Sequence, residues 1–445
     1  MVMYMIKKNV NCNFKKFCLV ILLLLITFMT ACTALKPIKE STNVATDNQY
    51  EPYDNIETAD LLDNQKNNKL SVGILLPLTG KAEKIGKIML KSAQLSMFNN
   101  KLNNIALLPY DTKGTAFGAV EAINSAIRDN VDIIVGPLFT QSTKAIMDIA
   151  EMNNIIMLSF SDNQNLLDSK HPNVYLMGLT PQQEIYRMVS YLIDYQNFYG
   201  FSAMFPNDVY GSIANNSFKD VIFRKDAKIV KTEFYTKNDK NLQKKVNNIL
   251  NANTFKDEVY EKYEQEKALA KAEGLSLDVE FKYTDEDKIY ADALLLPDSG
   301  EELLKIGEDI ANSTSEHKPL MVGTSKWLNN NLYTNPNFKN ALFVAPNPNN
   351  YVSFENMYYN VYQEYPLRVA SLAYDAITAV IQSYAKAKNK DNLKYAIENY
   401  QGFDGVNGKF RFLSNGLLER RLAIIKIKNG MFEIIDYDDE PFLKY

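Results

Sequence analysis

From residue 69 onward, the chain alternates short, continuously apolar runs with longer segments in which apolar residues recur every three or four positions. The first run, 70–78, is typical of a strand that is buried on both faces of a sheet. The next segment, 84–99, carries an apolar stripe at helical spacing. Because this pair of patterns repeats along the chain, the sequence predicts an α/β architecture with parallel sheets covered by helices on both faces.

The repeated pattern contains too many units for one sheet of ordinary size, so we expect two doubly wound lobes. Further strands are expected at 105–110, 131–135, 155–158, 201–205, 229–235, 293–296 and 320–322. Further helices are expected at 116–128, 144–153, 184–195, 213–223 and 242–251. Polar junctions at 178–181, 345–350 and 402–405 are the expected crossings between lobes. They divide the chain into a first lobe of 69–178 with 346–402 and a second lobe of 179–345 with 403–445.

One region, 254–290, interrupts this rhythm because it is dense in lysine, glutamate and aspartate. Opposite charges at a spacing of four residues predict a solvated surface helix. Two interpretations stay open: an insertion without a function of its own, or a docking surface for a partner protein.

The first residues form a secretory signal pattern: lysines, then about a dozen apolar residues, then Thr30, Ala31 and Cys32. The apolar run is shorter than the ~20 residues that a membrane-spanning helix needs. The pattern resembles the lipobox of bacterial lipoproteins, although Met29 stands where leucine is usual. The resemblance implies removal of 1–31 and lipidation of Cys32, and the alternative is an uncleaved anchor. The polar segment 32–68 is predicted to be a flexible tether.

Composition excludes several classes of protein. A formal net charge of −4 gives no basic footprint for nucleic acid. All three cysteines lie within the first 32 residues, so we expect no disulfide in the body of the protein. The two histidines, His171 and His317, are far apart and lie in no metal-binding motif. We therefore expect no metal, no cofactor and no enzymatic activity.

Polar residues follow several of the predicted strands, where ligands bind in open α/β sheets. These candidates are Thr79, Gly80, Thr140, Gln141, Ser142, Ser159 and Ser161. Hydroxyl groups beside helix N-termini suit a carboxylate. The same residue types also serve simply as helix caps, so both interpretations stay open.

The chain carries an ordered series of motifs: VGILLPLTG, DIIVGPLFTQST, LSFSDN, PNDVYG, DALLLPDSGEEL, LMVGTSKW, LAYDAI and GVNGKFRFLSNG. This series resembles the type I periplasmic binding proteins of the leucine/isoleucine/valine-binding group, and within it the penicillin-binding-protein activator lipoproteins. The resemblance implies two lobes, joined by three hinge crossings, that close on a ligand. It also implies that Ser142 and Ser161 hold the carboxylate and amino group of an amino acid, that Tyr210 caps the ligand, and that Asp298 meets an ammonium group.

Phe160 and Asp162 depart from the pattern of amino-acid binders, since they are expected to narrow the mouth of the site and to bring a negative charge close to a carboxylate. The leading hypothesis is therefore a lipid-anchored, non-enzymatic regulator in the periplasm, at the outer membrane, with a peptidoglycan synthase as its partner. The alternative is a solute-binding protein that delivers an amino acid or small peptide to an ABC permease.

Overall fold

The apolar run that opens the body of the chain forms strand β1 (Leu70–Leu76), in which every side chain except that of Ser71 is buried. The computed structural model describes residues 69–100, 104–274, 281–329, 332–428, 430–437 and 442. Burial on both faces places β1 inside its sheet, where it pairs in parallel with a strand on each side. The predicted signal segment, Cys32 and the tether lie outside the described residues.

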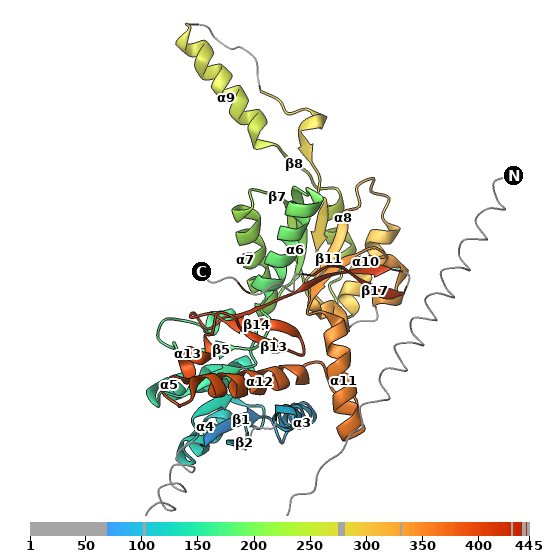
Figure 1. The fold of residues 1–445 in the computed structure, drawn as a ribbon. Helices are drawn as coiled ribbons and strands as arrows, with labels where there is room; N and C mark the ends of the chain where they lie inside the picture. Colours follow the sequence, from blue (N-terminus) through green and yellow to red (C-terminus); the bar gives the residue numbers. More distant parts are fainter. Residues whose placement is uncertain are drawn as a thin grey trace, which may run out of the picture. The chain divides into compact units, whose positions relative to one another are not determined.

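The first lobe is built on a five-stranded parallel sheet in the order β2-β1-β3-β4-β5. Its other strands are β2 (Ile105–Asp111), β3 (Ile133–Val135), β4 (Ile156–Ser159) and β5 (Val174–Leu176). One core cluster joins the sheet to helices α3 (Glu83–Asn100), α11 (Pro348–Tyr362), α12 (Ala370–Ala387) and α13 (Leu393–Ile397). A second cluster covers the other face with α4 (Ala116–Arg128) and α5 (Thr140–Met152). Figure 1 shows α3 and α12 beside this sheet.

The second lobe is built on a seven-stranded sheet in the order β17-β16-β12-β11-β10-β6-β7. Five strands are parallel: β6 (Gly200–Pro206), β7 (Lys228–Tyr235), β10 (Ala293–Leu295), β11 (Leu320–Gly323) and β12 (Leu342–Ala345). Two antiparallel strands complete it: β16 (Ala423–Lys428) and β17 (Met431–Asp436). Helices α6 (Pro181–Gln196) and α7 (Val209–Arg224) cover one face, and α8 (Leu242–Leu250) and α10 (Glu301–Asn312) cover the other. The α/β fold class with parallel sheets and covering helices is thereby confirmed.

The third crossing between the lobes, predicted at 402–405, is preceded in the structure by a small antiparallel sheet. It consists of β13 (Phe403–Gly405), β14 (Gly408–Phe412) and β15 (Leu418–Arg420). Phe410 and Phe412 point to one side of β14, as residues two apart in a strand do, and they pack into the core cluster of the first lobe. The predicted assignment of 403–420 to the second lobe is therefore wrong. The third crossing lies at 421–422, just before β16, because these phenylalanines bury their rings against the first sheet.

The charged region forms helix α9 (Asp257–Ala272), which has no buried residue, as its charge pattern predicts. Two short antiparallel strands, β8 (Thr254–Phe255) and β9 (Lys288–Ile289), join the insertion to the second lobe. Short 3₁₀ helices occur at η1 (Gln164–Leu166), η2 (Asp285–Asp287), η3 (Ser325–Asn329), η4 (Leu332–Thr334) and η5 (Pro336–Phe338). Figure 1 shows α9 extending beyond β8.

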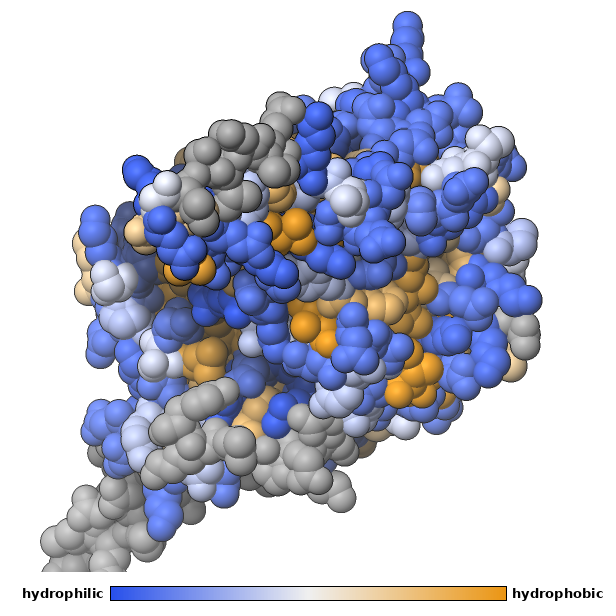
Figure 2. All heavy atoms as spheres, turned by 90° about the horizontal axis from the view of Figure 1, so that it is seen from above, coloured by the Kyte–Doolittle hydropathy of each residue, from blue (hydrophilic) through white to orange (hydrophobic). Residues whose placement is uncertain are grey.

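Within the described ranges, no helix has both the length and the apolar character needed to cross a bilayer. Hydrophilic side chains cover most of the face drawn in Figure 2, and apolar residues appear there in patches between them.

Candidate functional site

Side chains from both lobes and from the crossings line one cavity of about 430 Å³. The lining residues come from chain segments at the carboxyl ends of β3, β4, β5, β11 and β12, from the α11–α12 connection and the first turn of α12, and from the β13–β14 turn and the end of β15. They are Leu138, Phe139, Thr140, Phe160, Ser161, Asp162, Met177, Gly178, Leu179, Ser325, Lys326, Pro346, Arg368, Val369, Ser371, Leu372, Asn407 and Arg420. The carboxyl ends of strands are where open α/β sheets bind ligands.

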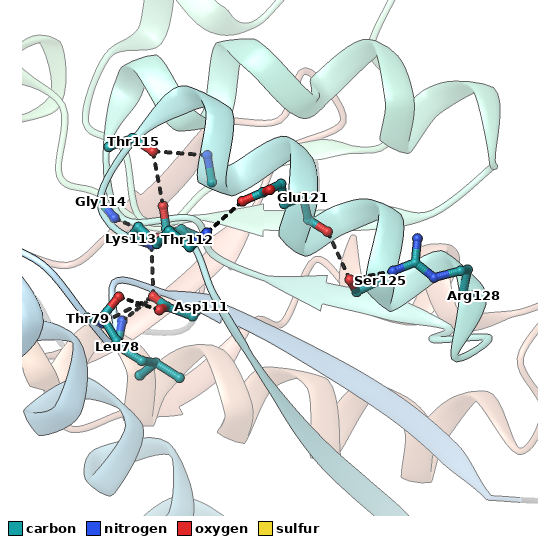
Figure 3. A network of polar contacts seen from close by, with 11 residues as sticks. Leu78, Thr79, Asp111, Thr112, Lys113, Gly114, Thr115, Glu121, Ser125 and Arg128 are labelled. Carbon is teal, nitrogen blue, oxygen red and sulfur yellow. Dashed lines mark hydrogen bonds and ion pairs between the residues drawn. The ribbon is translucent and has the colours of Figure 1, made fainter.

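The anion expected at Thr79 and Gly80 is supplied by the protein itself (Figure 3). The carboxylate of Asp111, at the end of β2, accepts hydrogen bonds from the backbone N–H groups of Leu78 (2.8 Å), Thr79 (3.2 Å) and Lys113 (2.8 Å). The Thr79 hydroxyl adds a fourth hydrogen bond of 2.6 Å. Burial acts to raise the pKa of Asp111, but these hydrogen bonds outweigh it, and the pKa lies below its ordinary value. Neither Thr79 nor Gly80 lines the cavity, and the backbone N–H and hydroxyl of Thr79 already donate to Asp111.

Two of the predicted residues, Thr140 and Ser161, meet at the cavity wall. Their hydroxyl oxygens lie 2.8 Å apart in a hydrogen bond, and both residues line the cavity. Helix α5 begins at Thr140, four residues before the predicted start, so Thr140 belongs to its first turn. The backbone N–H groups of a first helical turn have no partner within the helix. This part of the wall therefore offers hydrogen-bond donors to a ligand.

Of the neighbouring candidates, Ser159 belongs to the scaffold, and Gln141 and Ser142 lie outside the cavity. Ser159 is fully buried, and its hydroxyl lies 2.7 Å from the hydroxyl of Thr143. The backbone N–H of Ser161 donates to the Ser159 hydroxyl at 3.2 Å, which fixes the turn after β4. Ser142 is 1% exposed, its hydroxyl has no hydrogen-bond partner, and it does not line the cavity. Gln141 is exposed and also lies outside the cavity.

On the second lobe, the ring of Tyr210 supports Lys326, which lines the cavity. The ammonium nitrogen of Lys326 lies 4.0 Å from the ring centroid, a cation–π contact. The Tyr210 hydroxyl oxygen is buried without a hydrogen-bond partner. Burial, and then the nearby charge of Glu184, raise the pKa of Tyr210 well above its usual value. Tyr210 does not line the cavity itself, and its contact with the cavity is through Lys326.

Asp298, the predicted partner for an ammonium group, is engaged elsewhere. Its carboxylate accepts a hydrogen bond of 2.6 Å from the hydroxyl of Tyr235, at the end of β7. Burial, followed by the charge of Asp298, raises the pKa of Tyr235. Asp298 does not line the cavity, so it is not placed to meet a ligand there.

Glu184, in the first turn of α6, lies close behind the cavity and was missed from the sequence. It is 3% exposed, and its carboxylate accepts a hydrogen bond of 2.6 Å from the backbone N–H of Ser325. This contact joins α6 to the segment that carries Lys326. Burial raises the pKa of Glu184 to about 7, against the opposing effects of the Ser325 hydrogen bonds and of the Lys326 charge.

A buried ion pair ties α12 to the small sheet beside the cavity. The guanidinium of Arg420 lies 3.0 Å from the carboxylate of Asp375, and both side chains are almost fully buried. Asp375 also accepts hydrogen bonds from the backbone N–H of Val406 (2.6 Å) and the amide of Asn407 (3.2 Å). The motifs LAYDAI and GVNGK contain Asp375 and Asn407, so these residues were visible in the sequence, but their contact was not.

Arg368, in the α11–α12 connection, was likewise missed. Its guanidinium carbon lies 4.4 Å from the ring centroid of Tyr351, and its Nη2 atom is buried without a hydrogen-bond partner. Burial lowers the pKa of Arg368 to about 10, so it is charged at neutral pH. No pattern in the sequence marks this arginine, because its burial depends on how α11 and α12 pack.

Over the ranges that the structure describes, no group of three or more histidine, cysteine, aspartate or glutamate side chains is arranged to hold a metal ion. The cavity lining instead combines hydroxyls, three cationic side chains and apolar side chains. This set of groups can bind a small molecule that has both a polar and an apolar part.

Residues 69–254 match the family model for a periplasmic binding protein. A solved structure described as a putative branched-chain amino acid ABC transporter from Rhodospirillum rubrum superposes with a TM-score of 0.66 at 16% identity, covering 82% of this chain and 100% of that one. The fold is that of the type I periplasmic binding proteins.

Two further relatives of this fold were solved with ligands. A branched-chain amino acid transporter substrate-binding protein from Streptococcus pneumoniae, in complex with isoleucine, has a TM-score of 0.53 at 18% identity over 83% of this chain and 99% of that one. A solute-binding protein from R. palustris, in complex with benzoate, has a TM-score of 0.55 at 15% identity over 84% of this chain and 97% of that one.

Among curated proteins, an uncharacterized protein of Rickettsia prowazekii is 24% identical over 187 residues. The match covers 42% of this chain and about half (49%) of that relative's length.

Proposed function

We propose that this protein is a non-enzymatic binding protein that holds one small solute in the cavity between its two lobes and delivers it to a membrane permease. The observation that carries this proposal is the cavity itself, where Thr140 and Ser161 from the first lobe face the same space as Ser325 and Lys326 from the second. A volume of about 430 Å³ falls within the range of ~300–1,000 Å³ that is typical of small-molecule sites.

The chemistry of the lining supports binding rather than catalysis. Thr140 and Ser161 hydrogen-bond to each other, and no histidine is present among the described lining residues to act as a base for them. Phe160 packs into the core of the first lobe while lining the cavity wall, so the cavity persists despite this bulky residue. Asp162 is exposed, so the charged side chains deeper in the cavity are cationic.

For the location, we propose the periplasm, with the protein attached through a lipid on Cys32 to the outer membrane. The order of basic, apolar and small residues before Cys32 supports this assignment. The polar segment 32–68 then serves as a tether between the lipid and the first lobe.

Titration calorimetry with the purified protein tests solute binding against a panel of amino acids, small peptides, sugars and organic acids. The proposal expects saturable binding of at least one class, with one solute per chain. Lys326→Ala should weaken that binding by about tenfold or more, because it removes a charged contact. Lys144→Ala, at an exposed position of α5 outside the cavity, is the matched control and should bind normally. The absence of binding across all classes would refute the proposal.

A second function, regulation of a peptidoglycan synthase, is favoured by helix α9. This charged helix buries no residue, and at its base Tyr260, Tyr263 and Phe281 form an aromatic cluster with ring centroids 4.9–6.4 Å apart. Replacing 257–272 by a Gly/Ser linker leaves the cavity intact and should abolish co-purification with a synthase if α9 is the docking element. Unchanged co-purification, or none with the intact protein, would exclude this role for α9.

A further inference from the structure

Arg368 is a charged residue without an ion-pair partner among the described residues, although the charge of Glu355 acts on it from beyond ion-pair distance. It lies between α11 and α12, it lines the cavity, and its guanidinium stacks over the ring of Tyr351. Within the described part of the chain, no carboxylate lies at ion-pair distance from it, and its Nη2 atom is buried with no hydrogen-bond acceptor. Arg368 is partly buried as a residue, and a buried guanidinium N–H group without an acceptor is unfavourable, so this position favours an anion from outside the chain.

The second arginine of the cavity provides an internal comparison. Arg420 has its own carboxylate, that of Asp375 at 3.0 Å, and it also donates to the backbone carbonyl of Gly408 at 3.3 Å. The scaffold thus gives Arg420 a carboxylate in direct contact, whereas Arg368 has only the more distant charge of Glu355. An additional anion in the cavity would therefore pair with Arg368.

The remaining charges also disfavour a cationic group on the ligand. Lys326, Arg368 and Arg420 line the cavity, and Asp162 is the only acidic residue among the described lining residues. Asp162 is exposed, so it offers an ammonium group a well-solvated and weak partner. An ammonium group deeper in the cavity would face two nearby cations, Lys326 and Arg368.

The rest of the wall is mostly apolar. The apolar lining residues are Leu138, Phe139, Phe160, Met177, Leu179, Pro346, Val369 and Leu372. Such a wall favours burial of a hydrocarbon or aromatic group, which contributes roughly 25 cal/mol per Å² of apolar area. Thr140 and Ser161 supply the few polar groups that orient a ligand on this side.

We infer that the solute is a small organic carboxylate with an apolar body and no α-ammonium group, and that its carboxylate pairs with the guanidinium of Arg368. This inference rests on the proposed function as a solute-binding protein, and it names the class of solute. It differs from the expectation that the resemblance implied, in which Ser142 and Ser161 hold the carboxylate and amino group of an amino acid and Asp298 meets an ammonium group.

Two matched pairs of probes test the inference by titration calorimetry. Isocaproate and L-leucine share a carbon skeleton and differ by the α-ammonium group, whereas benzoate and benzamide differ by the negative charge. The wild-type protein should bind isocaproate at least about tenfold more tightly than leucine, and benzoate at least about tenfold more tightly than benzamide.

Variants at Arg368 identify the residue responsible. Arg368→Gln should weaken isocaproate binding by about 10- to 100-fold and leave benzamide unaffected, because it removes a charge-assisted hydrogen bond. Arg368→Lys should retain part of the affinity. Arg128→Gln, at an exposed site on α4, is the control and should bind as the wild type does. Without ligand, the thermal unfolding midpoint of Arg368→Gln should be no lower than that of the wild type. Weaker binding would then result from the missing guanidinium and not from unfolding of the variant.

Each other outcome overturns the inference. If leucine binds as tightly as isocaproate or more tightly, the site accepts an α-ammonium group, and this part of the inference is wrong. Carboxylate binding that Arg368→Gln leaves unchanged would exclude Arg368 as the partner. If neither acid binds while a sugar or peptide does, the inference fails and the proposed function stands. If no solute of any class binds, the proposed function fails as well.

Discussion

Neutralising Asp375 should destabilise the protein strongly, because it leaves Arg420 charged and buried. The two groups lie 3.0 Å apart, and their side chains are 0% and 1% exposed. Asparagine has nearly the same shape as aspartate and can still accept the hydrogen bond from the backbone N–H of Val406. The other carboxylate oxygen accepts from the Asn407 amide and pairs with Arg420, so the variant loses the charge and the acceptor at that position. Removing one partner of a buried ion pair typically costs about 3–5 kcal/mol, and we expect Asp375→Asn to lower the free energy of unfolding by that amount.

A double-mutant cycle in urea measures this effect. Arg420→Met should destabilise the protein by a similar amount, and the double variant should be much less destabilised than the sum of the two, because it leaves no unpaired charge. Asp220→Asn is the matched control, since Asp220 and Arg224 form an exposed ion pair at 2.9 Å that should contribute about 1 kcal/mol or less. Equal effects of Asp375→Asn and Asp220→Asn would refute the reasoning, and so would simple additivity in the cycle.

Three further predictions address other parts of the molecule. Asp111→Ala should lower the free energy of unfolding by about 1–3 kcal/mol, because it leaves backbone N–H groups without their acceptor, and urea unfolding beside the exposed control Glu121→Ala checks this. The pKa of Glu184 is raised from 4.5 to about 7, so the folded state binds its proton more tightly than the unfolded state does. The resulting stability is fully present below pH 4.5 and is lost as the pH rises through 7, by about 3 kcal/mol. Glu184→Gln cannot titrate, so its free energy of unfolding should fall less than that of the wild type between pH 4.5 and 8. The same pH dependence in both proteins would exclude a raised pKa at Glu184. Cys32→Ala should abolish incorporation of labelled fatty acid and Cys18→Ala should not, whereas labelling of both variants would contradict the lipidation assignment.

The fold was predictable because its determinants are local in the sequence. A strand buried on both faces, such as β1, must be a continuous apolar run, and the helices between strands carry one apolar stripe. The predicted helix at 116–128 coincides with α4. The third crossing was not predictable, because the short strands β13–β15 carry no signal for the lobe they join. Their place depends on the packing of Phe410 and Phe412 in the core of the first lobe.

The candidate site was only partly predictable, for a related reason. Thr140 and Ser161 follow strands that are neighbours in a parallel sheet, so their meeting follows from topology. The sequence also indicated an anion beside Thr79, but it could not show that Asp111, at the end of the adjacent strand, already supplies it. Glu184 and Arg368 acquire their importance from burial beside the cavity, which only the packed structure reveals.

The central claim is that a small solute occupies the cavity between the lobes. Native mass spectrometry of the protein purified gently from its own host tests it directly, with Thr140→Trp as a variant whose indole ring fills the cavity. We expect one small molecule per chain to be released from the wild-type protein on denaturation and none from Thr140→Trp. Release of no small molecule from the wild type, or of the same molecule in equal amount from both proteins, would contradict the account.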